Sequence, residues 1–267
     1  MFAFALWQPT DRTLYLARDR LGQKPLHYWH DGNYGDCGTL LFGSELRTLL
    51  VHPRAPRDID PIALAEYLRL RHVPAPLTMI RGIRQLPPAS LLTWRAEVGL
   101  AIRRWWQPEH RPDPRLRLDT AVEEFDGLWP GVIRRHLISD VPIGAFVSGG
   151  IDSGLVAAEA ARQMPGFRTF SIAFNDSAFD ETPHALATAR ALGCEHEVFR
   201  FDTPLEALLE EWVNAYDQPF ADPAAFPSLI LARETRRRVT VVLTGDGGDE
   251  LFAGYQRYRS TLVGRRF

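Results

Sequence analysis

The chain lacks the features of several large classes of protein. It has two cysteines among 267 residues, Cys37 and Cys194, which argues against a disulfide framework or a structural zinc site. The eight histidines show no metal-binding spacing such as His-Glu-x-x-His. The net charge is −2 and no long basic run is present, which argues against nucleic-acid binding.

Long hydrophobic runs are missing as well, since none approaches the length of a transmembrane helix. The apolar start, Met1–Trp7, is short and lacks the basic residues of a signal peptide. We therefore expect no membrane partner and a cytoplasmic location. The composition, 45% hydrophobic and 24% charged, is typical of a globular protein with one or two domains.

Two familiar phosphate-binding signatures are absent, the Walker loop with its lysine and the Gly-x-Gly-x-x-Gly fingerprint. However, Ser-Gly-Gly-Ile-Asp-Ser at 148–153 joins a predicted strand, 143–147, to a predicted helix, 153–163. Such a turn directs backbone N–H groups and the positive end of the helix dipole at one point, which suits an anion. The alternative is an ordinary turn with a serine N-cap. A carboxylate at 152 favours the phosphate site, with Mg²⁺ bridging Asp152 and the phosphates.

From residue 119 onward, predicted helices and strands alternate. This order predicts an open parallel sheet with helices on both faces, and ligands beyond the carboxyl ends of its strands. The predicted strands are 143–147, 169–174, 196–201 and 239–243, and the predicted helices are 119–138, 153–163, 181–192, 204–216 and 224–237. The acidic turn Thr244–Glu250 follows the last strand and is expected to face the same site, where Asp249 could share Mg²⁺ with Asp152. The alternative is a solvated acidic turn.

Residues 1–104 are read as a β-rich unit, 105–118 as a linker and 119–267 as a second unit. The predicted strands of the first unit are 2–7, 13–17, 26–29, 39–42 and 90–94. Ser44 is expected to cap a helix through Leu50, and Asp60 to cap a helix from Pro61 to about Leu70. The pair Asp180-Glu181 is expected to begin a helix, and His196 and Glu197 to form a polar pair on a strand.

Several of these motifs together resemble the glutamine-dependent asparagine synthetases. The loop at 148–153 is similar to the pyrophosphate loop of the N-type ATP pyrophosphatases. The more specific segments are Leu-Thr-Gly-Asp-Gly-Gly-Asp-Glu-Leu-Phe-Ala-Gly-Tyr at 243–255, Phe-Asp-Glu at 179–181, Asp-Gln-Pro-Phe-Ala-Asp-Pro at 217–223, Arg-Asp-Arg-Leu-Gly-Gln-Lys-Pro-Leu at 18–26 and Phe-Gly-Ser-Glu-Leu at 42–46. The resemblance covers nearly the whole chain. It implies an α/β fold, a PP-loop synthetase domain preceded by the β-rich remnant of an Ntn glutaminase domain.

The resemblance also implies a reaction. ATP activates the side-chain carboxylate of aspartate as an aspartyl adenylate with release of pyrophosphate, and ammonia then attacks the adenylate, which leaves AMP. The implied pyrophosphate cradle is Ser148, Gly149, Gly150, Asp152 and Ser153. The implied nucleotide contacts are the backbones of Val147, Ile172, Thr244 and Gly245. Asp152 and Asp249 would hold Mg²⁺, and Asp246 would steer ammonia or accept its proton.

This sequence departs from the family pattern at several positions. The family's glutaminase nucleophile is a cysteine at residue 2 of the precursor, whereas residue 2 here is Phe. The family's glutamine-binding segments would all lie before Met1, so we expect a truncated glutaminase part and no glutamine hydrolysis by this chain. The family also continues well past the end of this chain, so we expect a synthetase part that is incomplete at its C-terminus. Gly154 replaces a common hydroxyl residue, and Gln218 replaces a common glutamate. A homodimer or a glutaminase supplied in trans would fit this arrangement.

Two other functions remain open at this point. A related enzyme could amidate or cyclise a different carboxylate, such as a sugar acid or a β-lactam precursor. A non-catalytic nucleotide-binding fragment would bind ATP without releasing pyrophosphate. A substrate panel in a pyrophosphate-release assay separates the three.

Overall fold

The computed structural model describes residues 1–32, 38–178 and 180–264, so Cys37 and Phe179 lie outside the described residues. The chain forms two compact units. One contains residues 1–112 together with 208–225, and the other contains residues 113–207 together with 226–267.

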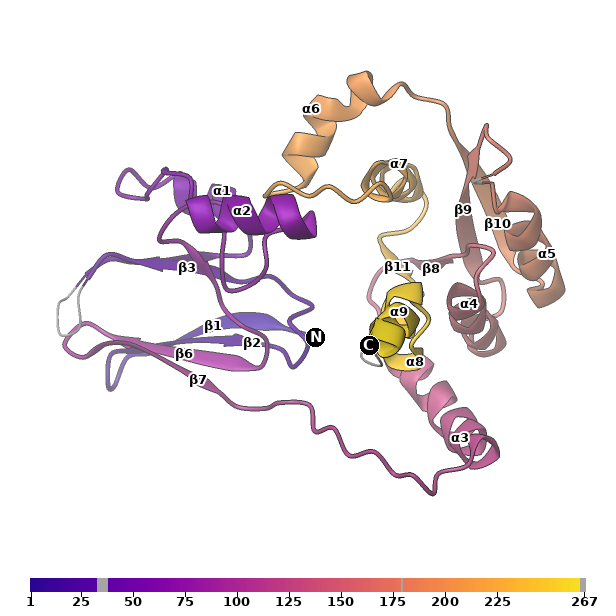
Figure 1. Ribbon diagram of the computed structural model, residues 1–267, viewed down its shortest axis with the longest axis horizontal. Coiled ribbons are helices and arrows are strands. Elements are labelled where there is room, and N and C mark those ends of the chain that lie inside the picture. Colours follow the sequence, from indigo (N-terminus) through magenta and orange to yellow (C-terminus); the bar gives the residue numbers. More distant parts are fainter. Residues whose placement is uncertain (33–37, 179, 265–267) are drawn as a thin grey trace. The chain divides into compact units, whose positions relative to one another are not determined.

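The first unit is built on two antiparallel sheets. One has the order β1 (Ala3–Gln8), β2 (Thr13–Arg18), β6 (Ser90–Arg95), β7 (Gly99–Arg104), and the other has the order β4 (Leu40–Gly43), β3 (His27–His30), β5 (Arg84–Gln85). Leu16, Leu26, Leu86 and Leu92 form a buried cluster supplied by both sheets and the segments beside them. Figure 1 shows α1 (Leu46–Leu50) and α2 (Pro61–Leu70) beside β3.

Two strands of this unit were not predicted. β5 has only two residues, too few for any periodic pattern. β7 begins with glycine, ends with two arginines and has only a three-residue apolar run between them, too short to predict a strand. Both strands are recognised only through their partners, β3 and β6.

The two predicted helix caps of this unit had different outcomes. Asp60 caps α2 as predicted, because its carboxylate accepts hydrogen bonds from Ile62 N at 2.9 Å and Ala63 N at 3.3 Å. The prediction that Ser44 caps α1 is wrong. Glu45 occupies the N-cap position without a side-chain bond, and the Asp217 carboxylate instead accepts from Leu46 N and Arg47 N.

The second unit contains the predicted parallel sheet. Its order is β10 (Glu195–Phe201), β9 (Arg168–Phe174), β8 (Ile143–Phe146), β11 (Val241–Leu243), and all three pairings are parallel. Its helices are α3 (Leu118–His136), α4 (Ile151–Gln163), α5 (Thr182–Leu192), α7 (Ala225–Thr235), α8 (Gly248–Phe252) and α9 (Gln256–Gly264), while α6 (Leu205–Ala215) begins here and ends in the first unit. Across the described residues, we find no helix with the length and hydropathy needed to cross a membrane.

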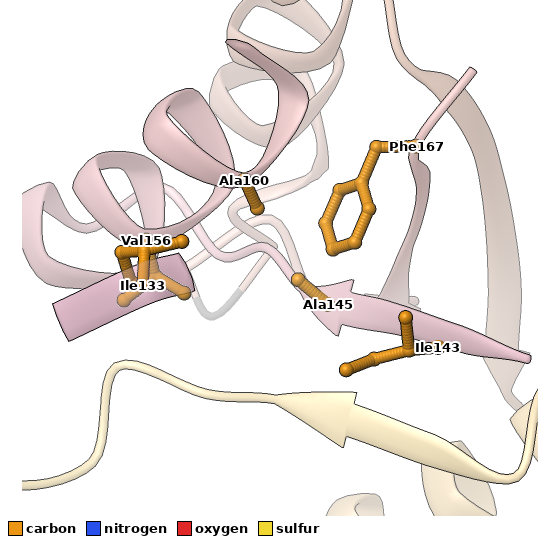
Figure 2. Close-up of a cluster of buried hydrophobic side chains, with 6 residues drawn as sticks. All are labelled: Ile133, Ile143, Ala145, Val156, Ala160 and Phe167. Carbon is orange, nitrogen blue, oxygen red and sulfur yellow. The ribbon is translucent and has the colours of Figure 1, made fainter. Parts of the chain in front are cut away.

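The core of the sheet follows from the alternation of side chains along β8. Ile143 and Ala145 face α4, where they pack with Val156, Ala160 and other residues of the cluster drawn in Figure 2. Phe146 lies in a second cluster, which is built around three buried residues, Phe170, Leu231 and Val239. Helices therefore cover both faces of the sheet.

The strand order determines where a ligand can bind. The chain builds the sheet outward from β8 through β9 to β10, then returns to place β11 on the opposite side of β8. The order of the strands thus reverses between β8 and β11. In open α/β sheets, ligands bind beyond the carboxyl ends of the strands at such a reversal.

Candidate phosphate-binding site

Two loops meet at the carboxyl ends of β8 and β11, as the sequence predicted. These strands are parallel neighbours, with Ala145 opposite Leu243, so the segments that follow them leave the same edge of the sheet. A Cβ atom added to Gly245 would lie 2.8 Å from Ser153 N and 3.1 Å from Asp152 Cβ. A Cβ added to Gly248 would overlap the Asp152 carboxylate. The glycines of the second loop therefore allow its backbone to lie directly against the first turn of α4.

The first loop is held by its two serines. Ser148 N donates to Ser153 Oγ at 3.1 Å, and Gly150 N donates to Ser148 Oγ at 3.0 Å. The two hydroxyl oxygens lie 2.9 Å apart. Ser153 is buried, whereas Ser148, Gly149 and Gly150 are exposed. The cradle predicted from the sequence is thus a closed turn with its glycines at the surface.

Asp152 occupies the first turn of α4, where a negative charge is favoured by the helix dipole. It is half-buried and lies against the backbone of Gly248. The first three N–H groups of α4 have no helical partners, since Gly154 N is the first to bond back, to Gly150 O. The polar groups around Asp152 therefore comprise its own carboxylate, the serine hydroxyls and the backbone N–H groups of the first turn of α4.

Asp246 and Asp249 of the second loop have different neighbours. Thr244 Oγ1 donates to Asp246 Oδ2 at 2.8 Å, which holds that exposed carboxylate beside the end of β11. Asp249 lies in the first turn of α8, and its carboxylate lies against the backbone of Gly254. Among the described residues, no group of three or more His, Cys, Asp or Glu side chains is placed to hold a metal ion. An Asp152–Asp249 magnesium site stays a prediction.

Of the predicted nucleotide contacts, Val147 directly follows β8, and Ile172 lies within the neighbouring strand β9. Val147 N donates to Phe170 O at 2.9 Å, and its side chain is buried with Ala157 and Ala185. Ile172 lies on β9 and packs against the cluster around Phe170. The Val147 side chain is buried, so only its backbone could contact a ligand, whereas the Ile172 side chain is partly buried.

The structure adds a carboxylate that was not among the predicted site residues. Glu181, just before α5, accepts a hydrogen bond from Gly149 N at 3.0 Å. Glu181 is the N-cap residue of α5 but makes no side-chain cap bond, and the preceding Asp180 accepts from Thr182 N at 3.2 Å. The hydrogen bond from the Thr182 hydroxyl is the main cause that lowers the pKa of Asp180. The sequence indicated the helix start at this pair, but it gave no sign that Glu181 reaches the phosphate loop.

Two family models match this chain. The family model described as asparagine synthase matches residues 131–267, and the model described as glutamine amidotransferase domain matches residues 1–106. The chain is 36% identical over 264 residues to "Asparagine synthetase [glutamine-hydrolyzing] 1" of Bacillus subtilis, a match that covers 98% of this chain and 40% of the relative. It is 38% identical over 275 residues to "Putative asparagine synthetase [glutamine-hydrolyzing]" of Mycobacterium bovis, covering 100% of this chain and 41% of the relative.

A more distant relative has a different name. The chain is 29% identical over 286 residues to "Amidase chyE" of Penicillium rubens, covering 98% of this chain and 41% of that protein. This chain therefore spans about 40% of the length of each of these three relatives.

Proposed function

This chain belongs to the asparagine synthase family, and on that premise we propose that it supplies the site at which ATP activates the side-chain carboxylate of aspartate for amidation. The reaction forms an aspartyl adenylate and releases pyrophosphate, after which ammonia displaces AMP. The observation that carries this proposal is the meeting of the 148–153 and 244–249 loops at the strand-order reversal between β8 and β11.

The loop residues bind and orient the phosphates. Ser148 and Ser153 offer hydroxyl donors, and the glycines 149 and 150 let a phosphate approach the backbone. The N-terminus of α4 contributes a positive partial charge where the leaving pyrophosphate gains negative charge. Gly245 lies against Ser153, so the backbone of Thr244 and Gly245 is close enough to the phosphate loop to contact the nucleotide.

The acidic residues have two roles in the proposal. Asp152, at the start of α4, would hold Mg²⁺ with Asp249, and the ion would neutralise phosphate charge when bound. Carboxylate oxygens beside an anion cradle fit such an ion. Asp246, held by the Thr244 hydroxyl, is placed at the exposed end of β11 and would orient the incoming amine or accept its proton.

Pyrophosphate release tests the proposal. The protein is incubated with ATP, Mg²⁺ and aspartate, with either ammonium or glutamine as nitrogen source, beside an Asp152→Ala variant and an Asp140→Ala control outside the two loops. We expect release with ammonium that Asp152→Ala loses and Asp140→Ala keeps. ATP binding without pyrophosphate release under any condition would contradict the catalytic proposal and identify a nucleotide-binding protein.

The acid that is amidated is a separate part of the test. The relative named as an amidase is the observation that favours a second candidate, amidation of a carboxylate other than that of aspartate. Release that requires aspartate supports the first candidate. Pyrophosphate release that does not depend on aspartate but requires another acid, from a panel of sugar acids and amino acids, supports the second candidate.

A further inference from the structure

The Glu181 carboxylate occupies a position in the phosphate loop that the proposed function reserves for a phosphate. Three consecutive loop N–H groups, those of Ser148, Gly149 and Gly150, each have a partner. Two of the partners are serine hydroxyls of the loop itself. The third is the carboxylate of Glu181, which comes from another element and is the only anion of the three.

The contact between Gly149 and α5 is close. A Cβ added to Gly149 would lie 3.0 Å from His184 Cβ and 3.3 Å from Glu181 Cβ. Any side chain at 149 would thus push against the first turn of α5. The absence of a Cβ is what allows the Gly149 N–H to meet the Glu181 carboxylate at hydrogen-bond distance.

The backbone that carries Glu181 is fixed, whereas its side chain lies at the surface. The Asp180 carboxylate accepts from Thr182 N at 3.2 Å. Glu181 O, at the N-cap position, accepts from His184 N at 3.0 Å and Ala185 N at 3.1 Å. Ala185 is buried against Val147 and Ala157. The Glu181 side chain itself is exposed, so it can turn away from Gly149 without disturbing the core.

We propose that Glu181 is a positioning residue that competes with pyrophosphate for the Gly149 N–H group. The inference rests on the proposed function, because it takes the 148–153 loop as the phosphate cradle. A carboxylate and a phosphate oxygen are both anions and cannot share one donor without repulsion. Phosphate binding therefore displaces Glu181, and the return of Glu181 helps to expel pyrophosphate after the adenylate has formed.

Direct binding of inorganic pyrophosphate measures this competition without any turnover. Isothermal titration calorimetry compares the wild-type protein with Glu181→Gln and Glu181→Ala, each with and without Mg²⁺. Removing one exposed charge about 4 Å from the ligand predicts binding about fivefold tighter in both variants. Glu124→Gln, an exposed change of equal charge on α3, serves as the matched control and leaves the affinity unchanged.

Each outcome has one meaning. Tighter binding in both Glu181 variants, but not in the control, supports the inference. Equal or weaker binding in the variants overturns it and leaves the phosphate loop intact, and weakening found only with Mg²⁺ would make Glu181 a metal ligand instead. If neither the wild-type protein nor any variant binds pyrophosphate, the proposed function itself fails, and the inference fails with it.

Hydrogen exchange of the Gly149 amide gives a second readout. We expect the amide to exchange faster in Glu181→Ala than in the wild-type protein, because its acceptor has been removed. Unchanged exchange would show that the hydrogen bond does not restrain the loop and would overturn the inference on its own.

Discussion

At the scale of single residues, Gly245 of the second loop leaves no room for a side chain. Gly245→Ala places a Cβ 2.8 Å from the backbone nitrogen of Ser153, which cannot rotate away. We expect the two loops to separate, with ATP affinity lost and the free energy of unfolding lowered by about 1–3 kcal/mol. Binding of a fluorescent ATP analogue and the urea midpoint measure the two effects.

Gly127→Ala is the matched control for this change. Gly127 lies inside α3 and nothing lies within 4 Å of an added Cβ. Alanine there should stabilise the protein by about 0.5–1 kcal/mol through helix propensity and leave ATP binding unchanged. If Gly245→Ala binds ATP as tightly as the wild-type protein, contact between the 148–153 and 244–249 loops is not required for ATP binding.

The expected polar pair of His196 and Glu197 does not form. Neighbouring strand residues point to opposite faces of the sheet, so His196 and Glu197 face different partners. The His196 ring nitrogens lie 2.8 Å from Thr169 Oγ1 and 3.0 Å from Ser171 Oγ, while Glu197 accepts from Arg238. Burial lowers the pKa of His196, so the folded state favours the neutral ring.

This pKa shift has a defined consequence for stability. The unfolded chain takes up the proton more readily, so the stabilisation is fully present above the ordinary histidine pKa of about 6.5 and is lost as the pH falls below it. Urea midpoints between pH 7.5 and 5.0 should fall less steeply for His196→Gln than for the wild-type protein. Parallel curves for these two proteins, or an equal change in the exposed control His110→Gln, would contradict the assignment.

At the scale of elements, α1 depends on a residue far away in the sequence. Its first two N–H groups donate to the Asp217 carboxylate rather than to the expected Ser44. Asp217→Ala should therefore lower the free energy of unfolding by about 1–2 kcal/mol, the usual cost of a lost cap, whereas Ser44→Ala should be close to neutral. Equal urea midpoints for the two variants would contradict the assignment of Asp217, rather than Ser44, as the cap of α1.

At the scale of the whole molecule, the segment 208–225 packs within the first unit although it lies late in the sequence. Met79 N donates to Gln218 Oε1 at 2.9 Å, and Ala221 N donates to Arg71 O at 2.8 Å. Residues 107–117 are exposed and contain no helix or strand. Cleavage by trypsin after Arg115 should thus give two fragments that still elute together in size-exclusion chromatography.

The double variant Asp217→Ala, Gln218→Ala tests whether contacts of the segment 208–225 hold the two fragments together. Fragments of this double variant should elute separately, since the hydrogen bonds accepted by both side chains are gone. A Glu123→Ala, Glu124→Ala double variant on exposed positions of α3 serves as the control. Separate elution of the wild-type fragments would show that the segment does not hold them together.

The sequence by itself determined the parallel sheet, the helices between its strands and the two loops that meet at its edge. Local patterns carry this information, because apolar runs, glycine turns and helix formers act over a few residues, and parallel connection then forces β8 and β11 to end at the same edge. The Asp60 cap was predictable for the same reason.

Only the tertiary structure decided which partners distant residues take. The caps of α1, the strands β5 and β7, and the contact of Glu181 with Gly149 depend on groups that lie apart in the sequence. No local pattern encodes them, since a carboxylate such as Asp217 or Glu181 is equally suited to solvent, to a cap or to a loop N–H. Its role is set by the backbone donor that folding brings within reach.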